Sequence, residues 1–515
     1  MTFKRLLLIV LTLLAIMTSG LSLFGSWQKP QLQSRLELYQ TNIVLQAQAW
    51  QPKGSNDENF LVIRETILGD KPLESATKQY QQARESVATN LDKAEIQLAK
   101  LGQDTHPKPL PELSSQEQQQ QLRKSVNELQ KLRDDLDLRL GILQVQQGEI
   151  DKALKTWSKV QETSEVNSEL KQTAKVLSGL WSKSPQLLPN AQQLIQKNLE
   201  GWFCFTALIK LYQLQQSEYI LADIKAGQQA AASDAMWKLA IIATIPSLTA
   251  FIGVILLVAL IIQLLLKGKE SILAANADNR WSTPWDVETI LQVFVLGFFL
   301  MGQLFIPVLF SLIPISRSSS NVRVQAFSVL VSYLLVALGA FSVLYYAIKR
   351  YFPLPQGWFR FRFQSNWFLW GLGGYCTALP IVVIVSLINQ QLWQGQGGSN
   401  PLLQLALESR DHIALGILFF TAGIAAPFFE EFLFRGFLLP SLTRYIPVWG
   451  AIGASSLLFA VAHLSLSEIL PLTALGIVLG IIYTRSRNLL APMLLHSLWN
   501  SGTLLSLFLL GSGNN

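Results

Sequence analysis

Two adjacent glutamates stand in a part of the chain that is otherwise almost free of charge. Glu430 and Glu431 end an apolar run that covers about residues 413–429. A carboxylate left unpaired in hydrocarbon costs at least about 2.5 kcal/mol on insertion scales, so the pair needs an explanation. Arg435 lies four residues beyond Glu431, and on a continuous helix those two side chains share a face while Glu430 points about 100° away. The spacing predicts one paired and one free glutamate.

Two histidines lie in the apolar runs that follow, each four residues from a second motif residue. His463 follows Phe459, and His496 precedes Asn500. Each run thereby presents a compact polar group on one helical face. A lone intramembrane histidine is usually a packing residue, and Glu431 with Arg435 alone would fit an interfacial ion pair. Three polar clusters on three neighbouring segments favour a shared site instead.

A glutamate, two imidazoles and a carboxamide are the groups that amide hydrolysis needs. A glutamate in a low-dielectric site can act as a base towards water, with an imidazole to help position or deprotonate that water. A second imidazole and a carboxamide can donate hydrogen bonds to the oxyanion that forms. The same groups can also build a metal site, with Glu430, His463 and His496 as candidate ligands for a divalent ion such as zinc. HExxH is absent and asparagine is a poor zinc ligand, but two histidines and two glutamates would supply enough ligands, so the cofactor stays open.

The ordered motifs resemble one family of membrane enzymes. EExxxR at 430–435, FxxxH at 459–463 and HxxxN at 496–500 are together similar to the CPBP family of intramembrane proteases, named for CAAX-prenyl and bacteriocin processing and also called the abortive-infection family. The resemblance covers the chain from about Asp411 onwards. It implies that Glu430 activates water with His463 as its partner, that His496 and Asn500 bind the oxyanion, and that Glu431 and Arg435 support them. Family members are described both as metalloproteases and as glutamate-dependent proteases, and the implied fold is a helical bundle that opens towards the cytoplasm or sideways into lipid.

The overall composition also points to a membrane. Half of the 515 residues are hydrophobic and only 15% are charged, whereas about 25% is usual for a soluble protein. The net charge of +7 belongs largely to residues beside apolar runs, which indicates contact with membrane lipid and no nucleic-acid partner. Two cysteines, Cys204 and Cys376, lie in regions of opposite character, so no disulfide framework is expected.

The apolar runs predict an all-α, polytopic bundle of about eight transmembrane helices behind an N-terminal segment. Residues 6–24 follow Lys4 and Arg5 and form a signal peptide or an uncleaved anchor; the lack of a clean small-x-small cleavage site favours the anchor. The bundle runs are residues 239–266, 290–315, 326–348, 367–389, 413–429, 448–464, 469–483 and 491–510.

Basic residues in the connections predict the orientation. Those expected on one side are Lys267, Lys269, Arg280, Lys349, Arg350, Arg360, Arg362, Arg444, Arg485 and Arg487, whereas Arg317 and Arg323 belong to a short loop on the other side. The positive-inside rule makes the first group cytoplasmic, as it does the start of the anchor. Because Glu430 and Glu431 are expected to end a helix on that side, the site is predicted to face the cytoplasm.

The segment between the anchor and the bundle is polar and helical, and it is predicted to be exported. Leu140, Gly141, Gly148, Ala153 and Trp157 have the spacing of one tetratricopeptide hairpin, in which small residues let two helices approach closely. A helical spacer and a repeat that binds a protein partner are both open. The predicted organisation is an anchor or signal at 1–24, the exported TPR-like domain at 25–238, leading transmembrane helices at 239–405 and a protease core at 406–515.

These observations together predict an intramembrane endopeptidase that hydrolyses a membrane-associated or peptide substrate. The alternative is a non-catalytic membrane scaffold or bacteriocin-immunity-type protein whose exported domain binds a partner. A transporter is a third possibility, since embedded glutamate and histidine also serve proton relays, although no inverted repeat is evident. Geometry discriminates between these classes, because hydrolysis requires Glu430, His463, His496 and Asn500 to meet around one cavity.

Overall fold

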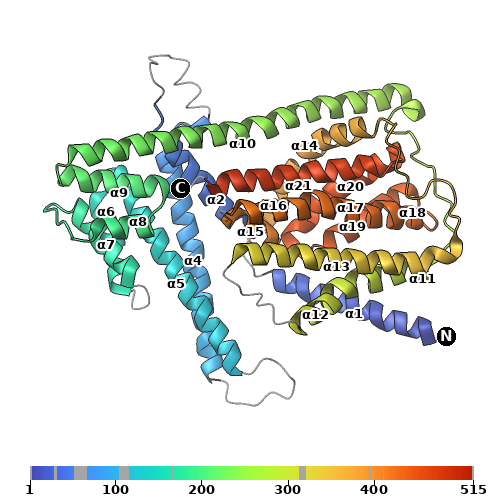
Figure 1. Ribbon diagram of the computed structural model, residues 1–515, viewed down its shortest axis with the longest axis horizontal. Helices are drawn as coiled ribbons and strands as arrows, with labels where there is room; N and C mark the ends of the chain where they lie inside the picture. The colour runs from blue at the N-terminus through green and yellow to red at the C-terminus, as the bar shows by residue number, and fades with distance from the viewer. Residues whose placement is uncertain are drawn as a thin grey trace. The chain divides into compact units, whose positions relative to one another are not determined.

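A computed structural model describes residues 3–27, 32–51, 67–103, 115–163, 168–312, 321–393, 396–409 and 411–512. Within these ranges the regular elements are helices and there is no β-strand, which confirms the predicted all-α class (Figure 1). The chain divides into two compact units. We call Ser34–Ala243 with Ser512–Asn515 the helical unit, and Met1–Gln33 with Thr244–Gly511 the membrane bundle.

The helical unit consists of hairpins that pack around one apolar core. Its helices are α2 (Leu32–Ala47), α4 (Pro72–Gln103), α5 (Ser115–Gln146), α6 (Ile150–Thr163), α7 (Ser168–Trp181), α8 (Ala191–Asn198), α9 (Gly201–Leu214) and the first part of α10 (Glu218–Lys267). Tyr80, Trp157 and Phe203 are among the largest fully buried side chains of this core. Burial of such aromatic side chains supplies much of the stabilisation that a helical domain of this size needs.

The α5–α6 hairpin explains the small residues that the sequence places there. A Cβ at Gly141 would lie 2.2 Å from the Trp157 ring, so only glycine allows the two helices to approach with this indole between them. Gly148 turns the chain between the helices with φ +83°, a conformation that favours glycine. Whether the hairpin is a tetratricopeptide repeat stays a prediction.

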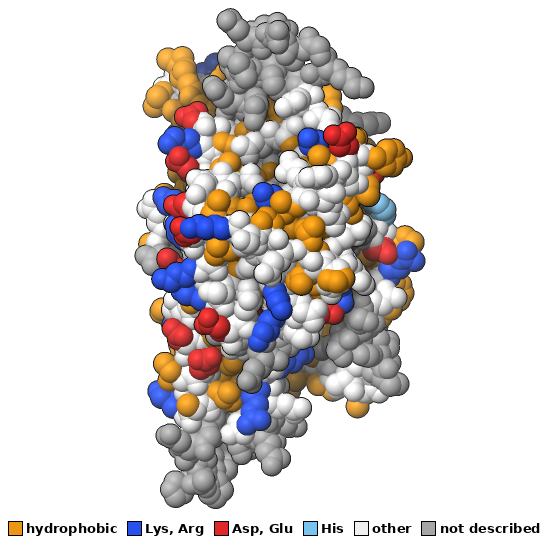
Figure 2. Space-filling model, turned by 90° about the vertical axis from the view of Figure 1, so that its left-hand side faces the viewer, with side chains coloured by type: hydrophobic (Ala, Val, Ile, Leu, Met, Phe, Trp, Pro, Cys, Tyr) orange, Lys and Arg blue, Asp and Glu red, His pale blue; other side chains and the backbone are white. Residues whose placement is uncertain are grey.

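The surface of the helical unit carries charges of both signs. Figure 2 shows Lys and Arg side chains interspersed with Asp and Glu side chains on this face, over the elements at the left of Figure 1. No large area of a single charge covers the part of the face that is coloured. A mixed surface of this kind is typical of a solvated domain and is not the basic footprint of nucleic-acid binding.

The membrane bundle contains the predicted spans, with one exception in length. Eight described helices are long and apolar enough to cross a bilayer: Phe3–Ser26, Glu218–Glu270, Val287–Leu312, Val322–Tyr351, Trp367–Trp393, His412–Leu442, Leu466–Ser486 and Leu490–Gly511. The run at 448–464 instead forms a shorter helix, α19 (Val448–Val461). The backbone turns after Val461 and Leu464 takes a positive φ of 55°, so the helix cannot continue to residue 464 as predicted.

The predicted basic connections meet at one end of the bundle, which we call the basic end. The Asn488 side chain donates a hydrogen bond to the Arg362 carbonyl at 2.8 Å, and the Arg487 guanidinium lies over the Trp281 ring. At the start of α1 (Phe3–Ser26), Lys4 pairs with Glu288 at 3.0 Å. The grouping of these residues at one end therefore follows from contacts within the bundle. Arg317 lies outside the described residues.

The span His412–Leu442 contains two π-helical segments, and each precedes a proline. It runs through α16 (His412–Phe420), η4 (Thr421–Ala425), α17 (Ala426–Glu431), η5 (Phe432–Leu438) and α18 (Leu439–Leu442). Pro427 and Pro440 have no backbone N–H, so carbonyls one turn earlier lose their usual donor and the helix widens there. These wider turns leave backbone oxygens available to side chains of neighbouring helices.

Candidate functional site

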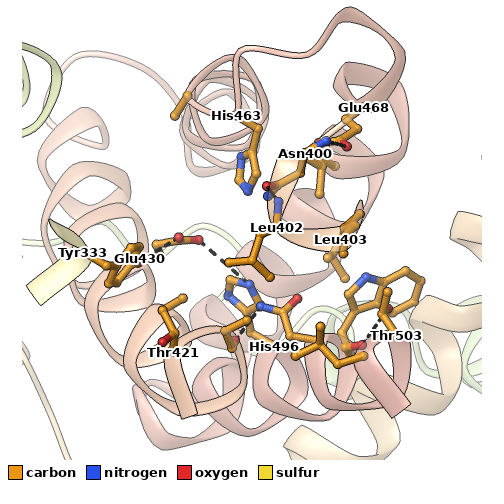
Figure 3. Close-up of a pocket in the computed structure, with 18 of the residues that line it drawn as sticks. Tyr333, Asn400, Leu402, Leu403, Thr421, Glu430, His463, Glu468, His496 and Thr503 are labelled. Atoms are coloured by element: carbon orange, nitrogen blue, oxygen red, sulfur yellow. Dashed lines mark hydrogen bonds and ion pairs between the residues drawn. The ribbon is translucent and has the colours of Figure 1, made fainter. Parts of the chain in front are cut away.

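A cavity of about 640 Å³ lies inside the bundle and collects the motif residues from three segments. Glu430 comes from α17, His463 from the turn after α19, and His496 and Asn500 from α21 (Leu490–Gly511). Figure 3 shows Glu430, His463 and His496 directed towards the same space from different helices. The convergence that hydrolysis requires is therefore present in this geometry.

Glu431 and Arg435 form the predicted i, i+4 ion pair. Arg435 Nη1 donates to Glu431 Oε1 at 2.8 Å, and both side chains are fully buried. Arg435 Nη2 also donates to the Gly476 carbonyl at 3.1 Å, and its guanidinium lies 4.6 Å from the Phe459 ring centroid. Glu431 Oε2 and Arg435 Nε have no hydrogen-bond partner in the described structure. A buried pair that is incompletely satisfied adds little stability, so positioning is the better explanation for it.

His496 lies between the two glutamates. Its Nδ1 is 2.8 Å from Glu431 Oε1, and its Nε2 is 3.9 Å from Glu430 Oε2. Because an ionised carboxylate only accepts, Nδ1 donates to Glu431 and the ring is held with Nε2 directed at Glu430 and the cavity. Glu431 does not face the cavity itself, but it orients the His496 ring that does.

Glu430 is not free, contrary to the prediction from spacing. The Tyr333 hydroxyl of α13 (Val322–Ile348) donates to Glu430 Oε1 at 3.0 Å. The Glu430 side chain is 15% exposed and lines the cavity, whereas Glu431 is completely buried. One carboxylate oxygen is therefore held by tyrosine, and the other faces His496.

His463 follows the end of α19 and is oriented by its own motif. Its Nδ1 lies 2.9 Å from the Phe459 carbonyl oxygen. A carbonyl oxygen only accepts, so Nδ1 carries the hydrogen and Nε2 of the neutral ring is left as an acceptor. The Phe459 ring also lies edge-on to both imidazoles, with centroids 5.0 Å from His463 and 5.7 Å from His496. Phe459 thus explains the first position of FxxxH: it fixes one histidine by its backbone and packs against both by its ring.

Asn500 and its neighbour Ser497 are bound to the π-helical segment η4. Asn500 Nδ2 donates to the Ala422 carbonyl at 2.8 Å, and Ser497 Oγ donates to the Gly423 carbonyl at 2.5 Å. Both carbonyls belong to the wide turn before Pro427. Asn500 retains a second amide hydrogen, since a carboxamide has two. The proline therefore helps to position the helix that carries HxxxN.

The structure shows three features of the site that the spacing arguments did not give. Tyr333 is too far away in sequence for a motif to reveal, and Glu468 lines the cavity although it was placed in a short connection. The expectation that Glu430 and Glu431 end their helix is wrong. The helix continues to Leu442, because Arg435 is neutralised by Glu431 and the remaining residues up to Leu442 are largely apolar.

The candidate metal ligands do not form a metal centre in this geometry. Among the described residues there is no group of three or more His, Cys, Asp or Glu arranged to hold an ion. The Nδ1 atoms of both His463 and His496 are engaged within the protein, which leaves each Nε2 as the ring atom that would ligate an ion. Glu430, His463 and His496 are not assembled as the three ligands of a catalytic zinc in this geometry.

Comparison with known proteins finds relatives of the C-terminal segment. Residues 413–502 match the family model described as type II CAAX prenyl endopeptidase Rce1-like. The membrane-embedded CAAX protease MroQ of Staphylococcus aureus (strain USA300) is 27% identical over 137 residues, which are 25% of this chain and 54% of MroQ. YdiL of Bacillus subtilis (strain 168), provisionally named a membrane peptidase, is 26% identical over 133 residues, 26% of this chain and 53% of YdiL.

The chain thus spans about half the length of the curated relatives that it matches. No solved structure gives a significant match. The resemblance to the CPBP family is confirmed for this segment, and together with the eight apolar helices it makes the chain an integral, multi-pass membrane protein.

Proposed function

We propose that the protein is an intramembrane endopeptidase in which Glu430 activates a water molecule to hydrolyse a peptide bond. One observation carries the proposal: Glu430, His463, His496 and Asn500, from three segments, line a single cavity. The match of residues 413–502 to the CAAX endopeptidase model supports the same class of reaction. A scaffold would need only pairwise contacts between helices.

In the proposed reaction, water binds between Glu430 and His463. The His463 Nε2 accepts one hydrogen bond from the water, while a Glu430 oxygen takes its proton as the water oxygen attacks the carbonyl carbon. The protonated Glu430 then gives that proton to the leaving amine as the C–N bond breaks. Tyr333 holds the other oxygen of Glu430 and so fixes the direction of proton transfer.

The oxyanion is proposed to be stabilised by His496 and Asn500. With both ring nitrogens of His496 protonated, Nδ1 donates to Glu431 and Nε2 is available for the oxyanion. The formal charges of Glu430, Glu431, Arg435 and His496 then sum to zero, which suits a group of four in a low-dielectric site. Asn500 supplies its second amide hydrogen.

We further propose that the helical unit recruits a protein partner or the peptide substrate. This role rests on its independent core and its mixed-charge surface. Replacing the unit by an unrelated helical domain would then change which peptides are cleaved in membranes, while the chemistry at Glu430 is retained. An unchanged set of products and partners would contradict the role.

The hydrolytic proposal is tested by incubating the purified full-length protein in detergent with a library of apolar peptides and identifying products by mass spectrometry. Glu430→Gln keeps the shape of the side chain and the Tyr333 contact but removes the base, so we expect product formation to fall by about 10³-fold. Glu468→Gln is the matched control, because it makes the same change at another carboxylate that lines the cavity. Identical products at wild-type rate from Glu430→Gln would eliminate Glu430 as the base.

A further inference from the structure

The basic end of the bundle is closed above the site by an aromatic layer, made of Trp281, Trp285, Trp358, Phe437 and Tyr483. Trp285 and Phe437 are fully buried, and the Trp285 ring centroid lies 4.3 Å from Trp358 and 5.5 Å from Phe437. Trp281 stacks on Tyr483 at 5.5 Å. The indole N–H groups donate to neighbouring residues of the bundle; that of Trp285, for example, donates to Ser441 Oγ at 2.8 Å. Close packing of this kind fills the space between these side chains, so we expect no peptide to pass between them.

The cavity extends away from this layer. In the described structure its lining includes none of the five residues of the aromatic layer and none from the basic connections. It includes instead Asn400, Leu402 and Leu403, at the start of α15 (Pro401–Glu408), and Glu468, in the connection after α19. In Figure 3, Asn400 and Glu468 lie across the cavity from Glu430.

These connections belong to the opposite end of the bundle. Asn389, near the end of α14 (Trp367–Trp393), donates to the Ser467 carbonyl at 2.6 Å, and Ser26 at the end of α1 accepts from the Leu466 N–H at 3.2 Å. The Asn400 N–H donates to Glu468 Oε1 at 2.8 Å. Since α1 and α14 both begin at the basic end, the lining connections lie at the far end of these two spans.

We infer that a peptide substrate reaches Glu430 from the end opposite the basic end, and therefore from the non-cytoplasmic side of the membrane. The charge distribution gives the side, because connections rich in lysine and arginine remain in the cytoplasm. Helix α1 also ends at this opposite end, at Ser26, and the segment that follows it is the one predicted to be exported. The inference rests on the proposed hydrolysis and reverses the cytoplasmic opening expected from sequence.

Sided cysteine labelling of the full-length chain tests this inference. The starting variant replaces the native thiols by Cys204→Ser and Cys376→Ala, and single cysteines are then introduced by Leu402→Cys in the cavity mouth, Ser365→Cys at the basic end and Lys183→Cys in the helical unit. A membrane-impermeant maleimide is added to right-side-out and to inside-out vesicles. Thr503→Cys, a second position in the cavity lining, serves if Leu402→Cys does not accumulate.

We expect the cavity cysteine and Lys183→Cys to be labelled in right-side-out vesicles and to lose that labelling in inside-out vesicles, with Ser365→Cys behaving in the reverse manner. Cavity labelling that follows Ser365→Cys, or that occurs from neither side, would overturn the inference. The readout needs no turnover, so it is separable from the hydrolytic proposal. The labelling pattern is expected to be unchanged by Glu430→Gln, which removes hydrolysis alone.

Discussion

Both units bury carboxylates beside arginines, but what lies beyond each pair differs. In the helical unit, Asp137 binds Arg84, whose side chain is still 30% exposed, and no histidine pairs with either of them among the described residues. In the membrane bundle, Glu431 and Arg435 are both fully buried, and Glu431 continues through His496 to Glu430 and the cavity. The Asp137–Arg84 pair joins helices α4 and α5. The Glu431–Arg435 pair holds His496, and through it the reactive Glu430, in place.

Among the variants that follow, the largest effect is expected from the loss of the His463 side chain. His463→Ala takes away the acceptor for the attacking water, so we expect peptide cleavage to fall by about 10²–10³-fold. Thermal unfolding in detergent is expected to change little. The matched control is His412→Ala at the start of α16, where the ring contacts Phe508; equal losses of cleavage in both variants would remove the distinction between His463 and a packing histidine.

Removal of the arginine is expected to affect stability and activity together in the bundle. Arg435→Met leaves Glu431 buried without its cation, which costs about 3 kcal/mol. Arg84→Met in the helical unit is expected to cost less, because that arginine is partly exposed and Arg133 and Lys159 also act on the charge of Asp137. Unfolding of the two variants in detergent measures the difference.

The double variant Glu431→Gln with Arg435→Met separates the two roles of the pair. It removes the buried charge, so stability should recover towards the wild type. Cleavage should stay impaired, because His496 no longer has a carboxylate to bind its Nδ1. Recovery of both properties would show that the pair only supports the fold.

A smaller effect is expected from the tyrosine that binds Glu430. Tyr333→Phe removes one hydrogen bond to the Glu430 carboxylate and should lower kcat about tenfold, because the carboxylate is then held less firmly in place. Tyr375→Phe on α14 is the control, since no hydrogen bond joins Tyr375 to Glu430. A loss of stability without any fall in kcat would assign Tyr333 to packing alone.

The smallest effect concerns the Asp137–Arg84 pair of the helical unit. Burial raises the pKa of Asp137 above its ordinary value, against the opposing influence of Arg84. Since the folded state then holds the proton more tightly than the unfolded state, stability falls as pH rises from the unfolded pKa through the folded one. Asp137→Asn should remove this slope and leave peptide cleavage intact; urea titrations of the full chain between about pH 4 and 7 measure it. A slope that persists in the variant would assign it to other groups.

The sequence was informative where positioning is local. The pairing of Glu431 with Arg435 follows from i, i+4 geometry, and the helical class follows from the apolar runs. Tyr333 and Glu468 were not predicted as site residues because their contacts depend on the packing of distant helices. The glutamates were expected at a helix end because each was treated as an unpaired charge. Arg435 in fact neutralises Glu431, so the apolar helix can continue past both of them.

The π turn before Pro427 sets the direction in which Glu430 and Glu431 point from their helix. A π turn holds one residue more than an α turn over nearly the same rise, so everything after it is rotated by about 100° relative to what precedes it. Deleting one residue within Thr421–Ala425 would restore ordinary winding and swing both glutamates away from α21 without altering a single motif residue. A chain that keeps all three motifs but lacks this extra residue is therefore expected to be inactive.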